Sequence, residues 1–230
     1  GDLALAFADG IDMYAEEHIH RNTITNAGTI DAIAMATSAD NGFAFTSADG
    51  IDMDAEDIHD NIIENSGTIR AQATSEGDLA FAFADGIDMY ADDFIEDNSI
   101  TNTDTIEATA KATSTDDGFA LASAGGIDMD AEDLDIQDNI IENSGTIRAQ
   151  ATSEGDLAFS YAYGIDMYAE NDDIEDNLIT NTGTISVEAI STGDLVEAEA
   201  VGIYLHADER IEDNLITNTG TISAKATATS

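Results

Sequence analysis

The stretch GDLAFAFADGIDMYA, residues 77–91, decides the fold of this chain, because its last five residues recur along the sequence as Ile-x-apolar-x-Ala. An alternation with a period of two marks one face of a β-strand, and its return at a fixed longer spacing predicts a strand stacked on copies of itself. Twelve isoleucines hold this register, 18 to 21 residues apart and each followed four residues later by alanine: Ile11, Ile30, Ile51, Ile69, Ile87, Ile106, Ile127, Ile147, Ile165, Ile185, Ile203 and Ile222. The sequence therefore predicts an all-β fold, a parallel β-solenoid or β-helix.

The expected coil length depends on which side chains can be neighbours. Residues 77–90 return in similar form as residues 155–168, and the repeat of about 38 residues has two halves that both carry the Ile-x-apolar-x-Ala strand. Successive coils lie about 4.8 Å apart, so a 38-residue coil would place Asp52 directly beside Asp88 in a ladder of like charges. A coil of about 19 residues places Arg70 between them. We therefore expect about twelve coils of 18–21 residues, two for each 38-residue repeat, in a rod of roughly 55–60 Å.

Composition limits the partners of this solenoid. Forty-nine acidic residues against six basic ones give a formal net charge of −43, which excludes a nucleic acid held by phosphate contacts and disfavours an anionic membrane surface. No apolar run approaches the length needed for membrane insertion. Residues 1–230 are expected to form one solenoid domain without evident caps, either a fragment of a longer solenoid or a filament subunit, since both ends read as ordinary repeat sequence.

Two further sets of columns concern the interior. Large apolar residues are expected to form a second core column: Leu3, Phe43, Leu79, Phe119, Leu157 and Leu195. The alanines that alternate with them either bend inward as well or form a flat face against another molecule. Asparagine fills two columns, beginning at Asn22 and Asn26, which we expect to be stacked amides at a bend rather than a ligand site.

The acidic columns are the candidate functional residues. In coils of about 19 residues, Asp12, Asp31 and Asp52 are consecutive neighbours without a cation between them. Three carboxylates about 4.8 Å apart must turn into water, take up protons or share a divalent ion, and oxygen ligands suit Ca²⁺. The alternative is a solvated acidic face. The residues of the predicted calcium sites are Asp12, Asp31 and Asp52, then Asp88, Glu107 and Asp128 in the same arrangement, with Asp54 and Asp130 two residues along the same face.

The pattern Asn-[Ser/Thr]-Gly-Thr-Ile-x-Ala-x-Ala, repeated through nearly the whole chain, resembles the repeats of filamentous-haemagglutinin and autotransporter-passenger β-helices. These are secreted bacterial adhesins. The resemblance implies an extracellular or cell-surface location. It is specific for solenoid architecture and carries little information about a particular activity, because enzymes, adhesins and filaments share the architecture.

An enzyme is not expected, because the four histidines have no cysteine or serine partner at a recognisable spacing. A structural role is favoured: self-assembly end to end into a filament or adhesive stalk, stabilised by divalent cations, with lateral bundling as a further mode of association. The alternative is an adhesin passenger module that binds host or glycan surfaces. A third possibility, ice binding, rests on regular threonines such as Thr101, Thr103, Thr180 and Thr182, whose columns Glu64 and Glu142 interrupt.

Overall fold

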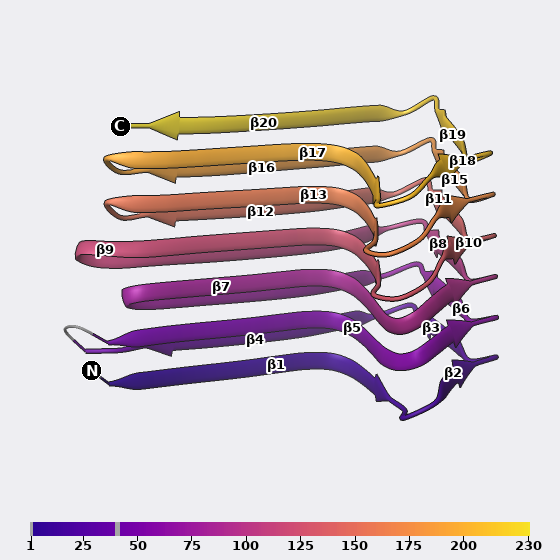
Figure 1. The fold of residues 1–230 in the computed structure, drawn as a ribbon, viewed down its shortest axis with the longest axis horizontal. Helices are drawn as coiled ribbons and strands as arrows, with labels where there is room; N and C mark the ends of the chain where they lie inside the picture. The colour runs from indigo at the N-terminus through magenta and orange to yellow at the C-terminus, as the bar shows by residue number, and fades with distance from the viewer. Residues whose placement is uncertain (1, 40–41) are drawn as a thin grey trace.

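A computed structural model describes residues 2–39 and 42–230, with the side chains of residues 116 and 117 excepted. Within these residues every regular element is a β-strand, and every strand pairing is parallel. The strands stack as a β-solenoid of about six turns (Figure 1), which confirms the predicted fold class. No helix that could cross a membrane occurs in the described ranges.

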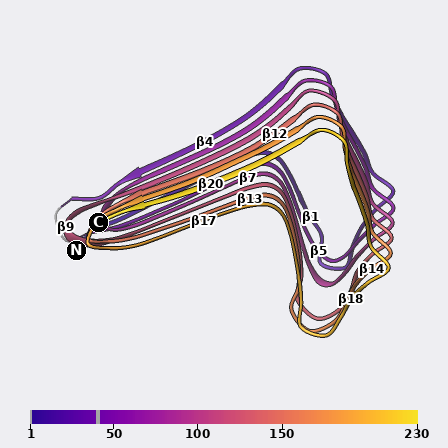
Figure 2. The same ribbon diagram turned by 90° about the horizontal axis from the view of Figure 1, so that it is seen from above.

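Each coil has three walls, which Figure 2 shows from above. A long strand, the outgoing wall, runs beside the strand that closes the coil, the return wall, and the two together form a narrow arm. The outgoing wall then bends away, and after a turn the chain passes along a short wall before it enters the return wall. We call the bend in the outgoing wall the elbow.

The strands are assigned to these walls as follows. The outgoing wall contains β1 (Leu3–Tyr14), β5 (Phe43–His59), β13 (Leu157–Ala169) and β17 (Leu195–Ala207), and the return wall contains β4 (Thr29–Thr37), β12 (Thr146–Glu154), β16 (Thr184–Thr192) and β20 (Thr221–Thr229). The long strands β7 (Thr68–Glu96) and β9 (Thr105–Ala131) pass from the return wall of one coil into the outgoing wall of the next. The short wall contains β3 (Thr23–Asn26), β6 (Ile62–Asn65), β8 (Ser99–Asn102), β11 (Ile140–Asn143), β15 (Leu178–Asn181) and β19 (Leu215–Asn218). The turn before it contains β2 (His18–His20), β10 (Ile136–Gln137), β14 (Ile174–Glu175) and β18 (Ile211–Glu212).

The register shows that one coil is about 38 residues long, so the expected coil of about 19 residues is wrong. Ile11 pairs with Ile51, and Ile51 with Ile87, whereas Ile30 pairs with Ile69 on the return wall. The two halves of each repeat therefore form opposite walls of the same coil rather than successive coils. Six coils at about 4.8 Å span only about 25–30 Å, about half of the expected rod.

The elbow requires glycine at one position in every coil: Gly10, Gly50, Gly86, Gly126, Gly164 and Gly202. A Cβ at Gly86 would lie 2.3 Å from Cγ2 of Ile106 and 2.5 Å from the carbonyl oxygen of Gly126. Both distances are far inside van der Waals contact. Glycine thus allows the outgoing wall to approach the return wall closely and then turn.

The interior of the arm is filled by alanine. Ala80, Ala82 and Ala84 of the outgoing wall and Ala71 and Ala73 of the return wall are all essentially inaccessible to solvent. The two walls are too close for larger side chains. The leucines and phenylalanines expected as a second core column therefore face outward; Leu79 is 46 % exposed and Leu157 is 39 % exposed. The alanine columns supply the core of the arm, and that part of the sequence-based prediction is reversed.

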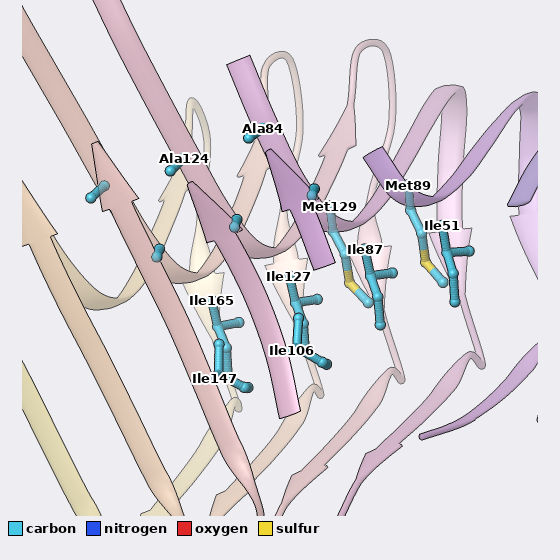
Figure 3. Packing of buried hydrophobic residues seen from close by; sticks show 14 of the residues in the cluster. Ile51, Ala84, Ile87, Met89, Ile106, Ala124, Ile127, Met129, Ile147 and Ile165 are labelled. Carbon is cyan, nitrogen blue, oxygen red and sulfur yellow. The ribbon is translucent and has the colours of Figure 1, made fainter. Parts of the chain in front are cut away.

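Beyond the elbow the coil is wide enough for larger side chains (Figure 3). Ile87 and Met89 of the outgoing wall and Ile106 of the return wall belong to one buried apolar cluster, and Ile127 and Met129 of the next coil continue it. All of these side chains are fully buried. Their burial explains the Ile-x-Met-x-Ala pattern that first identified the repeat.

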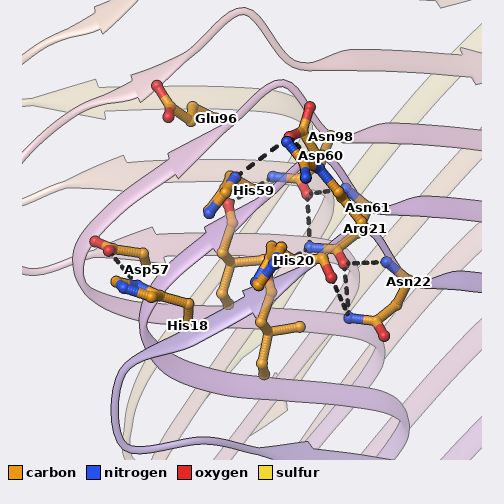
Figure 4. Close-up of polar contacts among 12 residues, drawn as sticks. His18, His20, Arg21, Asn22, Asp57, His59, Asp60, Asn61, Glu96 and Asn98 are labelled. Atoms are coloured by element: carbon orange, nitrogen blue, oxygen red, sulfur yellow. Dashed lines mark hydrogen bonds and ion pairs between the residues drawn. The ribbon is translucent and has the colours of Figure 1, made fainter.

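The asparagine columns are ladders of stacked amides, as expected. In the ladder at the end of the short wall, Nδ2 of Asn65 donates to Oδ1 of Asn102 at 2.8 Å, and Nδ2 of Asn102 donates to Oδ1 of Asn143 at 2.8 Å. The other ladder begins with Asn22 and Asn61 (Figure 4), and the residue before each of its members has a positive φ between 54° and 58°. Five of those six preceding residues are aspartates, which tolerate the left-handed conformation better than most residues.

The outer face of the short wall does not form an unbroken threonine array. Glu64 and Glu142 alternate with Thr25, Thr101 and Thr180 in one column. The carboxylates therefore interrupt the flat threonine surface on which the ice-binding hypothesis depended.

Candidate cation site at the elbow

Aspartates converge on the outer side of the elbow because glycine changes the alternation of the strand there. Ala48 and Ile51 both point into the core, on either side of Gly50, so Asp49 and Asp52 both point outward across the bend. Parallel pairing repeats the arrangement in the neighbouring coils. Asp9 and Asp12 occupy these positions in the preceding coil, and Asp85 and Asp88 occupy them in the following coil. Two adjoining columns of carboxylates result.

Two groups of three carboxylates have a geometry that could hold a metal ion. Asp9, Asp49 and Asp52 form the first group, and Asp49, Asp85 and Asp88 form the second. In each group one oxygen from every member lies within 4.8 Å of the others. Each group combines the first aspartate of one coil with both aspartates of an Asp-Gly-Ile-Asp segment in the next coil, and Asp49 belongs to both.

Asp49 is the most deeply buried member. Its side chain is 7 % exposed, and Oδ2 accepts a hydrogen bond from the hydroxyl of Ser47 at 3.1 Å. Oδ1 has no hydrogen-bond partner among the described residues. A buried carboxylate oxygen without a partner is costly, so this atom requires a proton, a water or a cation that the protein itself does not supply.

The series of such groups ends at Gly125, which occupies the position of Asp49 and Asp85 in the fourth coil. The N–H of Gly125 donates to Oδ1 of Asp85 at 2.7 Å, and a Cβ at this position would lie 2.4 Å from the same oxygen. Gly125 therefore leaves room for the carboxylate of Asp85, and it supplies no carboxylate of its own to the column. In the fifth and sixth coils Tyr163 and Val201 continue the column.

Burial at the elbow raises the pKa values of these carboxylates. Burial, together with the carboxylates of Asp52 and Asp9, raises the pKa of Asp49 to about 7, although the Ser47 hydroxyl and the backbone N–H of Asp85 offset part of this. Burial and the Asp9 carboxylate raise the pKa of Asp52 to about 6. The pKa values of Asp85 and Asp88 are raised well above the usual value, by burial first and then by the Asp128 carboxylate. Burial thus shifts these carboxylates toward their protonated forms, which reduces the repulsion that argued against a 38-residue coil.

The structure brings together only part of the predicted calcium-site residues. Asp12, Asp52, Asp88 and Asp128 form one unbroken column at the elbow, continued by Asp166. Asp54 and Asp130 lie on the same wall two residues along, separated from each other by Tyr90. They therefore do not form a continuous carboxylate column.

Asp31 and Glu107 do not join these carboxylates, because they lie on the return wall. Arg70 lies between them, with Nε at 3.3 Å from Oε2 of Glu107 and Nη1 at 3.9 Å from Oδ1 of Asp31. Arg148 contacts Glu107 from the next coil at 3.3 Å. The arginines do separate acidic residues, but in a different column from the one expected, and they neutralise charge there.

Asp9, Asp49 and Asp85 were missed by the sequence analysis. A strict period of two places them on the opposite face from Asp12, Asp52 and Asp88, and only the bend at the elbow glycine reverses that assignment. The segment Asp-Gly-Ile-Asp, present at residues 9–12, 49–52 and 85–88, is the signal that could have identified them.

A third acidic group, Asp135, Asp172 and Asp173, lies in the turns before the short wall. Asp173 is buried there, and the guanidinium of Arg210 in the next coil donates to both of its carboxylate oxygens. This group already has a protein cation and a bidentate ion pair. Arg210 offsets one of its three carboxylate charges, that of the buried Asp173.

Three histidines gather at the turn of the first two coils (Figure 4). Nδ1 of His18 lies 2.6 Å from Oδ2 of Asp57, and the rings of His20 and His59 stack with centroids 5.2 Å apart. His59 also contacts Asp60 at 3.5 Å. The histidines therefore contact carboxylates and one another within the turn, and no serine of the described residues is hydrogen-bonded to them.

The raised pKa values predict an unusual pH dependence of stability. Burial, then the Asp130 and Glu199 carboxylates, raises the pKa of Asp166 to about 7, and Asp128, Tyr163 and Tyr204 are its other neighbours on this wall. Between about pH 4 and 7 the folded protein retains a proton that the unfolded chain releases, so stability is expected to fall as pH rises, by up to about 1.4 kcal/mol per pH unit for one such group. Urea unfolding between pH 5 and 8, with a chelator present, measures this slope.

Asp166→Asn is expected to make that slope shallower, because the substitution removes the proton uptake while keeping the side-chain shape. The control is Glu142→Gln, which removes an exposed carboxylate from the short wall. A stability that rises with pH over this range, or an identical slope in Asp166→Asn and Glu142→Gln, would contradict the expected burial at the elbow.

Comparison of the chain with protein-family models, with curated proteins and with solved structures found no match in any of the three.

Proposed function

We propose that this chain is a structural β-solenoid whose coils associate end to end with those of further copies, forming a filament or adhesive stalk. The repeat pattern resembles that of secreted adhesin solenoids, which supports placing it outside the cell or on the cell surface. The single observation that carries the proposal is the equivalence of the coil edges. The isoleucine column and the asparagine ladder of the short wall continue through successive coils, so the pairing that joins one coil to the next within the chain is available between chains.

The short wall illustrates this equivalence. Ile63, Ile100, Ile141 and Ile179 form one core column and are at most 1 % exposed, whereas Ile216 in the last described coil is 46 % exposed. A further coil stacked on β19 would bury Ile216 as Ile179 is buried by β19.

Electron microscopy of the purified protein tests the proposal. Because each chain carries a formal charge of −43, assembly is expected to require salt or divalent cations that screen the repulsion between copies. Fibres with an axial repeat of about 4.8 Å are expected to form with calcium chloride and to shorten or disperse with a chelator. Dispersed monomers under both conditions would contradict the proposal.

A matched pair of variants identifies the surface responsible. Ile216→Lys places a charge where a stacked coil must bury an apolar side chain, and it is expected to prevent fibre formation. Thr217→Lys adds the same charge on the outer face of the same strand and is expected to leave fibre formation unchanged. Equal behaviour of the two variants would show that the coil edge is not the contact.

A second candidate function, a module that binds host or glycan surfaces, is favoured by the outer face of the arm. Phe81 lies between Phe43 and Phe119, with ring centroids 5.4 and 5.2 Å apart, and these rings line the outer face with Leu79. Apolar faces of this kind mark interaction surfaces. A glycan array probed with the wild type and with Phe81→Ser tests it; binding that survives Phe81→Ser, or the absence of any binding, rejects this candidate.

A further inference from the structure

The elbow of the first three coils contains carboxylates whose charge no protein group compensates. The two groups of three share Asp49, and five aspartates take part in all: Asp9, Asp49, Asp52, Asp85 and Asp88. No ion pair of the described residues involves any of them. This distinguishes the elbow from the other two acidic clusters, in which Arg70 and Arg210 supply the positive charge.

The buried oxygen of Asp49 points to a bound species rather than to protonation alone. If Asp49 is ionised, its unpartnered Oδ1 lies beside the carboxylates of both groups without compensation. Protonation of Asp49 alone removes only one of the five charges and leaves the other four carboxylates uncompensated. A cation shared with the neighbouring carboxylates satisfies Oδ1 and removes the like-charge repulsion at the same time.

We propose that the elbow binds two Ca²⁺ ions, one held by Asp9, Asp49 and Asp52 and the other by Asp49, Asp85 and Asp88, with Asp49 bridging the two ions.

The preferred coordination favours calcium over magnesium. Ca²⁺ accepts six to eight oxygen ligands in a flexible arrangement, whereas Mg²⁺ requires near-ideal octahedral geometry and usually keeps several waters. One oxygen from each member of a group lies within 4.8 Å of the others, so the three carboxylates are close enough to share one ion. Three carboxylates supply up to six oxygens, and water completes a coordination number of six to eight.

The geometry also explains why the sites stop after two. A third site would require a carboxylate at residue 125 beside Asp128, and glycine stands there. The two calcium ions offset four of the five carboxylate charges. The site depends on the packing of coils within one chain and is therefore independent of the proposed end-to-end association.

Equilibrium dialysis against calcium chloride in 150 mM sodium chloride, after treatment with a chelator, counts the bound ions. The expected result is that Asp49→Asn binds two ions fewer than the wild type, because both sites lose a shared ligand, and that Asp85→Asn binds one fewer. Asp166→Asn is the matched control: it removes one carboxylate from the same elbow, outside both groups, and is expected to bind calcium as the wild type does. Magnesium chloride is expected to bind at least tenfold more weakly at the same sites.

Thermal unfolding gives a second readout, in which the stability difference between Asp49→Asn and the wild type is expected to depend on whether calcium is present. Without calcium, Asp49→Asn is expected to be more stable than the wild type, because a repelling buried charge is gone. With calcium, the wild type and Asp166→Asn are expected to gain the most stability, Asp85→Asn is expected to gain less because it keeps one site, and Asp49→Asn is expected to gain none. Circular dichroism confirms that each variant is folded, and Asp85→Asn decides the question if Asp49→Asn is not. Equal calcium binding by Asp49→Asn, Asp85→Asn and Asp166→Asn would overturn the proposal, since it would show only a cloud of counter-ions around an acidic protein. Equal affinity for magnesium would overturn the assignment of calcium.

Discussion

Replacing Asn102 with leucine is expected to lower the free energy of unfolding by about 4 kcal/mol. Asn102 is fully buried in the asparagine ladder, where it accepts from Asn65, donates to Asn143, and donates to the carbonyl oxygens of Asp104 and Thr146. Leucine has a similarly branched but larger side chain, and it can make none of these bonds. It would leave Oδ1 of Asn143 and an N–H of Asn65 unpaired in the core, at about 2 kcal/mol for each buried group.

Asn218→Leu is the control for this prediction, because it makes the same change in the same ladder where the amide is exposed. Oδ1 of Asn218 accepts one hydrogen bond from Nδ2 of Asn181 at 2.7 Å. When Asn218 is replaced, water can accept the hydrogen bond from Asn181 instead. Its loss is expected to cost about 1 kcal/mol. Urea unfolding followed by circular dichroism measures both. Similar losses in the two variants would mean that the ladder does not hold the short wall together.

Gly86→Ala is expected to cost about 3 kcal/mol or more, a large effect for one methyl group. The new Cβ would collide with Cγ2 of Ile106 and with the carbonyl oxygen of Gly126, and a backbone carbonyl held in the strand ladder cannot move away as a flexible side chain can. The outgoing wall would have to shift from the return wall. Because Asp85 and Asp88 flank this glycine, the shift is also expected to separate their carboxylates.

Gly28→Ala provides the comparison. A Cβ at Gly28 meets only Oδ1 of Asn26, at 4.0 Å, so the change is expected to alter stability by less than about 1 kcal/mol. Thermal unfolding of the two variants measures the difference. If Gly86→Ala is as stable as Gly28→Ala, the walls of the arm are not as close at the elbow as the structure indicates.

The sequence allowed the fold class, the parallel stacking and the asparagine ladders to be predicted, because each depends on a pattern that repeats at every coil. The coil length could not be read from the isoleucine spacing. Ile87 and Ile106 lie on opposite walls of one coil, and two walls with the same local pattern produce the same period as two successive coils. The strict alternation of Met53, Ala71 and Met89 carried the missing information, since methionine belongs to the outgoing wall and alanine to the return wall.

The repulsion expected between Asp52 and Asp88 in a 38-residue coil was overestimated, because both carboxylates were assumed to be fully ionised in water. Burial at the elbow raises both pKa values. The elbow could not be predicted from the alternation of apolar and polar residues. Asp49 and Asp52 lie on one face only because the strand bends at Gly50, and a period of two does not indicate where a strand bends.

The 38-residue register is the central claim, because the elbow, the ladders and the proposed calcium sites all depend on it. The chain has no cysteine, so introduced pairs report distance directly. In the structure Glu107 is the strand neighbour of Arg148, whereas a 19-residue coil would make it the neighbour of Asp128. Neighbouring strands lie about 4.8 Å apart, within the Cα separations that disulfides span.

The measurement is oxidative cross-linking of two double-cysteine variants, followed by electrophoresis and mass spectrometry of the linked peptides. The account predicts that Glu107→Cys with Arg148→Cys forms an intramolecular disulfide, and that Glu107→Cys with Asp128→Cys remains reduced under the same conditions. Efficient cross-linking of the 107–128 pair, with none in the 107–148 pair, would contradict it.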